Sequence, residues 1–214
     1  IEIYSSDDGM NANGGSDSGF GGMMGGRGGR SSVTSTDTDK ESEDSETWIH
    51  ISGGNIYICN STGNDADGLD SNGDIIITGG TVRISLANTG SNSAIDFGSE
   101  NGGVCEISGG NVIACGSYSM AEAFDSSSTQ CSVLYTVSAG VEAGSTLTLE
   151  DADGTVLLSW EVPCSFSSVN LSCPQMQLGE RYLVAIGDSV EELTLEEVSA
   201  SYGDAQSGGF GGTM

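Results

Sequence analysis

The chain is poor in cationic residues. Its 214 residues include 5 Lys and Arg and 1 His, against 31 Asp and Glu, which gives a formal net charge of −26. So few cations cannot neutralise a phosphate backbone, and they cannot form a basic patch for an anionic membrane surface. We therefore expect neither nucleic acid nor a membrane as a partner.

Long hydrophobic runs and proline are also scarce. No stretch approaches the roughly 18 consecutive apolar residues that a membrane-spanning helix needs. With 2 Pro and 34 Gly, and no Gly-X-Y period, the composition excludes a proline-rich linker and collagen. A hydrophobic content of 36% is low but too high for a wholly disordered chain.

A zinc site is also excluded by composition. The six cysteines form no Cys-x-x-Cys pair, and His50 is the single histidine. An even number of cysteines indicates an exported protein with some disulfides. Buried free thiols are the alternative. The chain opens at Ile1 without an initiator methionine or a leader, so we expect either that a signal segment was removed or that this is part of a longer chain.

A repeat organises the first half of the chain. Ile-Ser-Gly-Gly at 51–54, Ile-Thr-Gly-Gly at 77–80 and Ile-Ser-Gly-Gly at 107–110 begin 26 and 30 residues apart. Leu69 and Ile95 are again 26 apart, and each is followed by an aspartate. Asp8-Gly-Met-Asn-Ala-Asn-Gly also matches Asp67-Gly-Leu-Asp-Ser-Asn-Gly, which places Ile3 in the position of Ile58.

A period in the twenties, with alternating apolar residues and no helical pattern, predicts a solenoid of stacked parallel strands. We expect an all-β chain, with a right-handed parallel β-helix over 1–124 and an inner row of Ile3, Ile58, Ile84 and Ala114. Residues 15–46 are predicted to be a flexible Gly/Asp-rich insertion. A small antiparallel β cap is expected over 125–202, with a hairpin turn at Asp153-Gly154, and a flexible tail over 203–214.

Oxygen ligands are densest in the turns of this repeat. Stacking brings the turn at 63–74 next to the equivalent turns of the rungs above and below it, where carboxylates would repel one another without a cation. Calcium takes about 6–8 oxygen ligands from such groups. The predicted calcium ligands are Asp7, Asp8, Asn11, Asp65, Asp67, Asp70 and Asp96. The alternative is a turn rich in Asp and Asn because these residues tolerate turn geometry.

An outward-facing row is predicted for Glu2, Tyr57, Arg83 and Ile113. An aromatic ring beside an arginine suits a sugar face and a uronic carboxylate, so Tyr57 and Arg83 are the candidate ligand-binding residues. Ordinary exposed strand residues are an equally good interpretation. No residue is predicted to be catalytic, since His50 has no serine partner and the turns are too short to form a cleft.

Several segments together resemble a known family. They are the Ile-Ser-Gly-Gly repeats, Asp67-Gly-Leu-Asp-Ser-Asn-Gly, the strand at 109–116, Ser-Met-Ala-Glu-Ala at 119–123 and Leu-Gly-Glu-Arg-Tyr at 178–182. Over roughly 1–14 and 48–188 the chain resembles the bacterial family of calcium-binding, parallel β-helix, carbohydrate-binding domain proteins, whose type member is a clostridial surface protein. The resemblance implies a secreted or cell-surface protein that binds cellulose or polygalacturonate without cleaving it. The chain departs from the family in lacking its first coils and in having more cysteines.

The expected function is therefore non-catalytic binding of an acidic polysaccharide, with calcium as the cofactor. Two alternatives remain: a filament subunit that self-associates through the ends of its β-helix, and a polysaccharide lyase or hydrolase. Among the cysteines, Cys59 and Cys115 are predicted to lie two rungs apart and to be unable to bond to each other. Cys164 and Cys173, which flank a short apolar strand, are the first pair to test.

Overall fold

The computed structural model describes residues 1–12 and 47–204, and these residues form an all-β protein. The prediction of the all-β class is confirmed. The strands are β1 (Glu2–Tyr4), β2 (Met10–Ala12), β3 (Trp48–Asn60), β4 (Leu69–Ser71), β5 (Asp74–Leu86), β6 (Ile95–Phe97), β7 (Cys105–Gly116), β8 (Ser132–Val141), β9 (Thr146–Asp151), β10 (Val156–Glu161), β11 (Phe166–Ser172), β12 (Arg181–Ile186), β13 (Ser189–Thr194) and β14 (Ser199–Gly203). Two short 3₁₀ helices, η1 (Ser99–Asn101) and η2 (Tyr118–Met120), complete the described elements.

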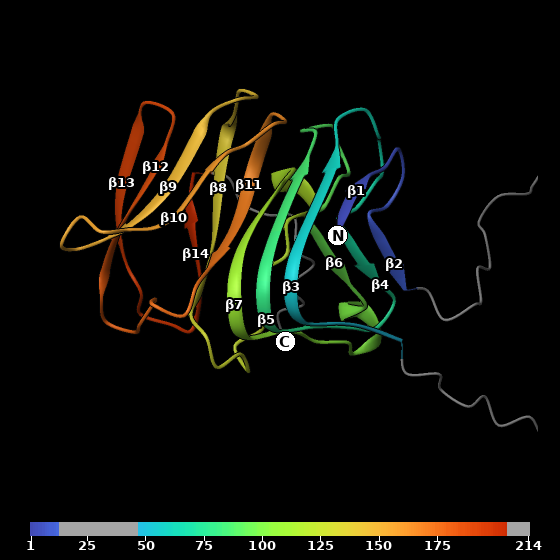
Figure 1. The fold of residues 1–214 in the computed structure, drawn as a ribbon, viewed down its shortest axis with the longest axis horizontal. Coiled ribbons are helices and arrows are strands. Elements are labelled where there is room, and N and C mark those ends of the chain that lie inside the picture. Colours follow the sequence, from blue (N-terminus) through green and yellow to red (C-terminus); the bar gives the residue numbers. More distant parts are fainter. Residues whose placement is uncertain (13–46, 205–214) are drawn as a thin grey trace, which may run out of the picture.

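The largest sheet has seven strands in the order β1-β3-β5-β7-β11-β8-β14. Its first four strands are parallel, and β3, β5 and β7 lie side by side across the middle of Figure 1. The sheet then changes direction, because β11 is antiparallel to both β7 and β8, while β14 is parallel to β8. The sheet as a whole is therefore mixed, and a purely parallel solenoid does not describe it.

A second, three-stranded sheet repeats the order of the first. Its strands β2, β4 and β6 are parallel and follow the order β2-β4-β6, just as β1, β3 and β5 do in the larger sheet. The pairs Met10–Leu69 and Leu69–Ile95 are in register, as the repeat predicts. The chain thus alternates between the two sheets, and equivalent residues of the repeat pair with each other in both.

The inner row predicted from the repeat is formed. Ile3 pairs with Ile58, Ile58 with Ile84 and Ile84 with Ala114, so these four residues occupy one position on successive strands. Ile58 and Ile84 are fully buried, and they pack with Leu69 and Ile95 of the smaller sheet in a single core. The hydrophobic core of this half therefore lies between the two sheets.

The Gly-Gly pairs mark bends inside long strands. Gly54, Gly80 and Gly110 have φ values of 84°, 95° and 101°, and the register of β3, β5 and β7 shifts at these points. Glycine adopts such positive φ values without steric cost. A Cβ atom on Gly80 would also lie 2.8 Å from the backbone of Gly53, so the stacked bends approach too closely for a side chain.

The C-terminal half differs from the predicted cap. Only β10, β9, β12 and β13 form a separate antiparallel sheet, which contains the expected Asp153-Gly154 hairpin between β9 and β10. Strands β8, β11 and β14 instead continue the large sheet beyond β7. Both sheets contribute to a second core that includes Phe166, Leu171 and Tyr182. The C-terminal strands therefore extend the sheet sideways as well as covering one of its faces.

The start of the predicted tail is ordered. Gly203 ends β14 in register with Thr136, and Asp204 accepts hydrogen bonds from the backbone N–H and the hydroxyl of Ser138, each 2.7 Å long. The predicted insertion at 15–46 and the rest of the tail lie outside the described residues. Within the described ranges, no helix has the length and hydrophobicity needed to cross a membrane.

Candidate cation site and aromatic face

Stacking of the repeat places aspartates directly above one another. Asn11, Asp70 and Asp96 occupy one position on β2, β4 and β6. Three residues before each of these positions, the carboxylates also bind the neighbouring repeat. Oδ1 of Asp8 accepts a hydrogen bond from the backbone N–H of Asp67 at 2.9 Å, and Oδ1 of Asp67 accepts one from the backbone N–H of Ser93 at 2.7 Å. Each aspartate thus binds the backbone of the next repeat, which fixes its carboxylate in place. We call Asp8, Asp67, Asp70 and Asp96 the carboxylate cluster.

The cluster contains two close pairs of carboxyl groups. Asp8 and Asp70 lie within hydrogen-bonding reach of each other, and so do Asp67 and Asp96. The side-chain amide of Asn11 donates hydrogen bonds to Asp8 at 2.7 Å and to Asp70 at 2.5 Å. One neutral amide cannot balance two carboxylates. Each pair therefore needs a shared proton or a cation.

The pKa values of the cluster reflect the repulsion between these carboxylates. Burial, with the nearby carboxylates of Asp96, Asp8 and Asp70, raises the pKa of Asp67 to about 7. Burial and the carboxylates of Asp8 and Asp96 raise the pKa of Asp70 to about 6. Burial and Glu100 raise that of Asp96. The charged neighbours that produce these shifts are all acidic, so the cluster suits a positively charged ligand.

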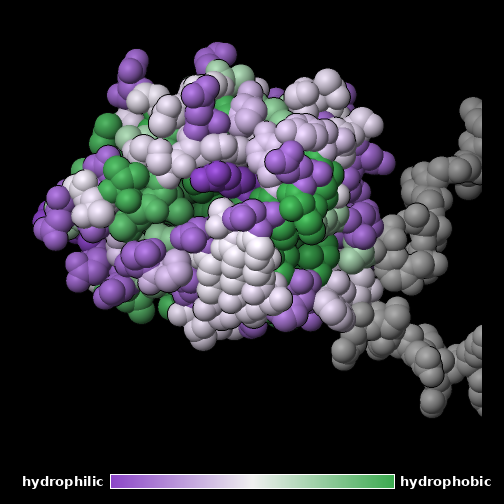
Figure 2. Space-filling view, in the orientation of Figure 1, coloured by the Kyte–Doolittle hydropathy of each residue, from purple (hydrophilic) through white to green (hydrophobic). Residues whose placement is uncertain are grey.

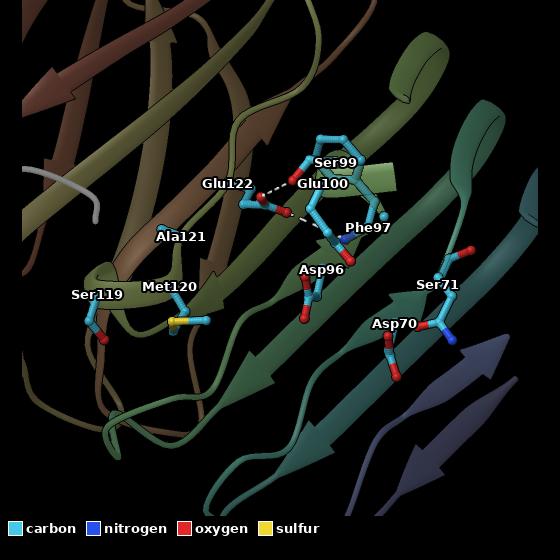
Figure 3. Close-up of a pocket in the computed structure, with 12 residues that line it drawn as sticks. Asp70, Ser71, Asp96, Phe97, Ser99, Glu100, Ser119, Met120, Ala121 and Glu122 are labelled. Atoms are coloured by element: carbon cyan, nitrogen blue, oxygen red, sulfur yellow. Dashed lines mark hydrogen bonds between the residues drawn. The ribbon is translucent and has the colours of Figure 1, made fainter. Parts of the chain in front are cut away.

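An acidic pocket adjoins the cluster. It has a volume of about 600 Å³, and Asp70, Asp96, Glu100 and Glu122 contribute carboxyl groups to its lining. Asp70 and Asp96 lie on neighbouring strands, while Glu122 approaches from the segment after η2 (Figure 3). The expectation that short turns leave no cleft is therefore wrong, because the segment after β7 folds back beside β6.

Glu122 is the functional candidate that the repeat did not reveal. Its carboxylate accepts hydrogen bonds from the Ser99 hydroxyl at 3.1 Å and from the backbone N–H of Phe97 at 3.4 Å (Figure 3). Burial raises the pKa of Glu122, and the carboxylate of Asp96 raises it further. Glu122 follows the last repeat and has no equivalent in it. The one signal in the sequence is its place in the Ser-Met-Ala-Glu-Ala segment.

Two of the predicted calcium ligands lie at the edge of the carboxylate cluster or outside it. Asp65 is exposed, and its backbone has a left-handed conformation with a φ of 58°. Its carboxylate is nevertheless close enough to raise the pKa of Asp96. Asp7 is exposed and is not among the groups that shift the pKa values of the cluster. Its backbone carbonyl instead accepts the Asn60 side-chain amide at 3.0 Å. The structure therefore groups five of the seven predicted ligands, with Asp65 beside them.

The donor set can be compared with the needs of calcium. Carboxylate and amide oxygens are the ligands that this hard cation prefers. Within the ranges that the structure describes, however, no three His, Cys, Asp or Glu side chains are already grouped as a metal site. The chemistry of the donors thus fits calcium, while coordination requires the Asp8, Asp70 or Asp96 side chains to turn towards a common point.

The predicted outward row is in register but is not uniformly exposed. Glu2 pairs with Tyr57, Tyr57 with Arg83 and Arg83 with Ile113. Arg83 is exposed and Tyr57 partly so, but Ile113 is only 3% exposed because it packs in the C-terminal core. Ile113 thus faces outward from the repeat as predicted but is covered by β10, a contact that has no counterpart in the repeat.

Tyr57 lies between two other aromatic rings. Its ring centroid is 5.7 Å from that of Tyr4 and 6.1 Å from that of Trp160, and both contacts are edge-to-face. We call these three residues the aromatic face. Beside it, a cavity of about 210 Å³ is bounded by Arg83 and by residues 157–159 of β10. The C-terminal strand thus supplies Trp160, which sequence reasoning missed, to a surface otherwise built by the repeat.

The aromatic face continues to one end of the molecule. Ile1 and Tyr4 are each 72% exposed, and Figure 2 shows hydrophobic side chains gathered over this end, near β1. In the carboxylate cluster, Asp70 and Asp96 lie on the other sheet and Asp8 and Asp67 just before its strands, so the two candidate sites can be tested independently. Comparisons of the chain with protein-family models, with curated proteins and with solved structures find no match.

Proposed function

We propose that this protein is a non-catalytic, calcium-stabilised binding module for an acidic polysaccharide such as polygalacturonate, acting as a secreted or cell-surface protein. The two sets of parallel strands would be coils of a right-handed β-helix, which is the usual hand of parallel crossovers. The resemblance to the family of calcium-binding, parallel β-helix, carbohydrate-binding domain proteins agrees with this assignment.

One observation carries the proposal: the paired carboxyl groups of the cluster lie together, and among the described residues no cationic side chain contributes to their pKa values. A divalent cation relieves that repulsion and strengthens the stack. The adjoining pocket leaves room for further ligands to the ion, which water or the carboxylates of a uronic acid polymer would supply. Calcium thereby gives a protein of charge −26 a means of holding a polyanion.

The aromatic face favours a sugar over other anionic ligands. Tyr4, Tyr57 and Trp160 present apolar ring surface to pyranose rings, and Arg83 offers a forked pair of donors to a uronate. Because this face lies on a different sheet from Asp70 and Asp96, it would give the polymer a second contact, separate from the one through calcium. Calcium dependence and arginine dependence are therefore separate properties of the same module.

The experiment is retention on immobilised polygalacturonate, with calcium or with a chelator. We expect retention in calcium that weakens in chelator and at high salt, and that weakens in Arg83→Ala. Arg181→Ala is the matched control, because Arg181 is an exposed arginine of β12 whose ion pair with Glu192 is 3.5 Å long. If both variants lost retention equally, Arg83 would act only through its contribution to the net charge.

The same incubation tests the alternative of an enzyme. Asp70, Asp96, Glu100 and Glu122 line one pocket, and pairs of carboxyl groups perform acid and base chemistry in glycosidases. Steady release of reducing or unsaturated sugars would assign the protein to the hydrolases or lyases. We expect no product after prolonged incubation.

The filament alternative is favoured by the edge strands. β1 and β2 stand at the ends of their sheets, with one edge of each not paired to any described strand. Such edges add strands from other molecules, and head-to-tail addition gives a fibre. Electron microscopy with and without calcium separates the two functions: filaments would favour assembly, and separate particles that bind pectin would favour the module.

A further inference from the structure

Cys164 joins the two halves of the molecule at one point. Cys59, Ser85 and Cys115 occupy one position on β3, β5 and β7, with Ser85 in the middle, as the predicted two-rung separation of the cysteines requires. Cys164, in the turn between β10 and β11, packs against this row, and its backbone N–H donates to the Ser85 hydroxyl at 3.0 Å. The loop is therefore positioned by a hydrogen bond that is independent of the thiols.

The Sγ atoms of Cys59 and Cys164 are 3.9 Å apart, and both cysteines are free in this structure. A disulfide needs about 2.05 Å, so side-chain rotation and a small shift of the loop must close the remaining gap. We propose that Cys59 and Cys164 form a disulfide that fastens the C-terminal half of the protein to strand β3. This bond is independent of the proposed binding function.

The pair predicted from the sequence, Cys164 and Cys173, is wrong on geometric grounds. The two residues flank β11, a strand of seven residues, at its opposite ends. At about 3.3 Å per residue the strand alone separates them by roughly 20 Å, far beyond the reach of a disulfide. The short separation of Cys164 and Cys173 along the sequence therefore led to a wrong prediction, because the segment between them is an extended strand.

The two cysteines differ in access, which gives the reaction an order. Cys59 is partly exposed, whereas Cys164 is 5% exposed, and burial raises the pKa of the Cys164 thiol. The Cys59 thiolate attacks an external disulfide, such as glutathione disulfide, and releases one thiol. The Cys164 thiolate then attacks Sγ of Cys59 in the mixed disulfide and releases the second. Two protons and two electrons pass from the protein to the external disulfide.

The expected consequence is a more stable native state. The two cysteines are 105 positions apart in the chain, so the bond would close a long loop in the unfolded protein. Closing a long loop removes much of the conformational entropy of the unfolded chain. It also links a strand of the repeat to the segment leading into the second core. We expect the melting temperature to rise by about 5 °C or more on oxidation.

The test is oxidation of the full chain with glutathione disulfide. We expect two fewer free thiols, a mass lower by two hydrogen atoms, and a peptide joining the Cys59 and Cys164 segments in a non-reduced digest. Cys59→Ser should abolish both this peptide and the rise in melting temperature, and its partial exposure makes the variant tolerable. Cys173→Ser, which removes a different buried thiol, is the matched control and should retain both.

Three results would overturn the proposal. They are a link that joins other cysteines, six thiols that persist after oxidation of the folded protein, and an unchanged digest in Cys59→Ser. Cys164→Ala provides the second arm: if it folds, it must leave Cys59 able to form only a mixed disulfide with glutathione. Should Cys164→Ala fail to fold, the peptide map of the unsubstituted chain still decides the outcome.

Discussion

Oδ1 of Asp8 accepts the backbone N–H of Asp67 at 2.9 Å, although the two residues stand 59 positions apart. Asp67 repeats the contact to Ser93 in the next rung, at 2.7 Å. Each carboxylate thus satisfies a backbone donor of its neighbour, and the same hydrogen bonds hold the acidic side chains in a stack. The stability of the repeat and the concentration of negative charge therefore have a common origin.

Calcium should stabilise the folded protein through this stack. Binding to the native state alone raises the free energy of unfolding by about 2.7 kcal/mol when calcium is at 100 times its dissociation constant. For a chain of this size that corresponds to a melting temperature several degrees higher in calcium than in chelator. Asp70→Asn, measured by thermal denaturation, should shrink this difference.

Asp153→Asn is the matched control for that substitution. Asp153 is exposed in the β9–β10 turn, far from the cluster in the fold, so the calcium effect should be unchanged. A melting temperature that does not respond to chelation in the unsubstituted protein would contradict the calcium proposal.

Without calcium, stability should fall as the pH rises. Asp67 and Asp70 have folded pKa values of about 7 and about 6, above the usual value of an aspartate. The folded state therefore binds protons more tightly than the unfolded state, and the stabilisation from these protons is lost as the pH rises through 6 and 7. Denaturant titrations in chelator should show greater stability at pH 5 than at pH 8.

Calcium should reduce this pH dependence, because the cation replaces the shared protons. Asp67→Asn should also reduce it, since the substituted side chain carries no titratable group. A stability in chelator that rises between pH 5 and pH 8 would contradict the raised pKa values.

Gly68→Ala tests how tightly the rungs approach. An added Cβ would lie 2.4 Å from the Ala94 carbonyl oxygen and 2.6 Å from a methyl of Ile84. We expect a loss of about 1–3 kcal/mol in the free energy of unfolding, as for other overpacked cores. Gly53→Ala is the control, since a Cβ there meets no atom within 4 Å, and it should change stability little.

Trp160→Ala tests the aromatic face. Removing the ring deprives Tyr57 of one of its two aromatic neighbours and removes apolar surface beside Arg83, so retention on polygalacturonate should weaken several-fold. Trp48→Ala removes the exposed tryptophan that contacts His50 rather than Tyr57, and should leave retention unchanged. Affinity electrophoresis measures both; equal retention of all three proteins would remove the aromatic face from the site.

The β class, the register of the repeat and the grouping of Asn11, Asp70 and Asp96 could all be predicted from the spacing of residues along the chain. These predictions succeed because residues at equal positions in a stacked repeat must become neighbours, so that a spacing of 26 residues becomes a spatial contact. The Gly-Gly bends were predictable for the same reason, since their positive φ recurs at each rung.

The contribution of the non-repeating half became visible from the three-dimensional fold alone. The antiparallel pairing of β11 with β7, the burial of Ile113, and the positions of Glu122, Trp160 and Cys164 join segments that share no period. These contacts arise because the outward face of the last repeat and the apolar strands after it bury each other. Such burial depends on shape and composition across the whole fold, which the spacing of residues along the chain does not specify.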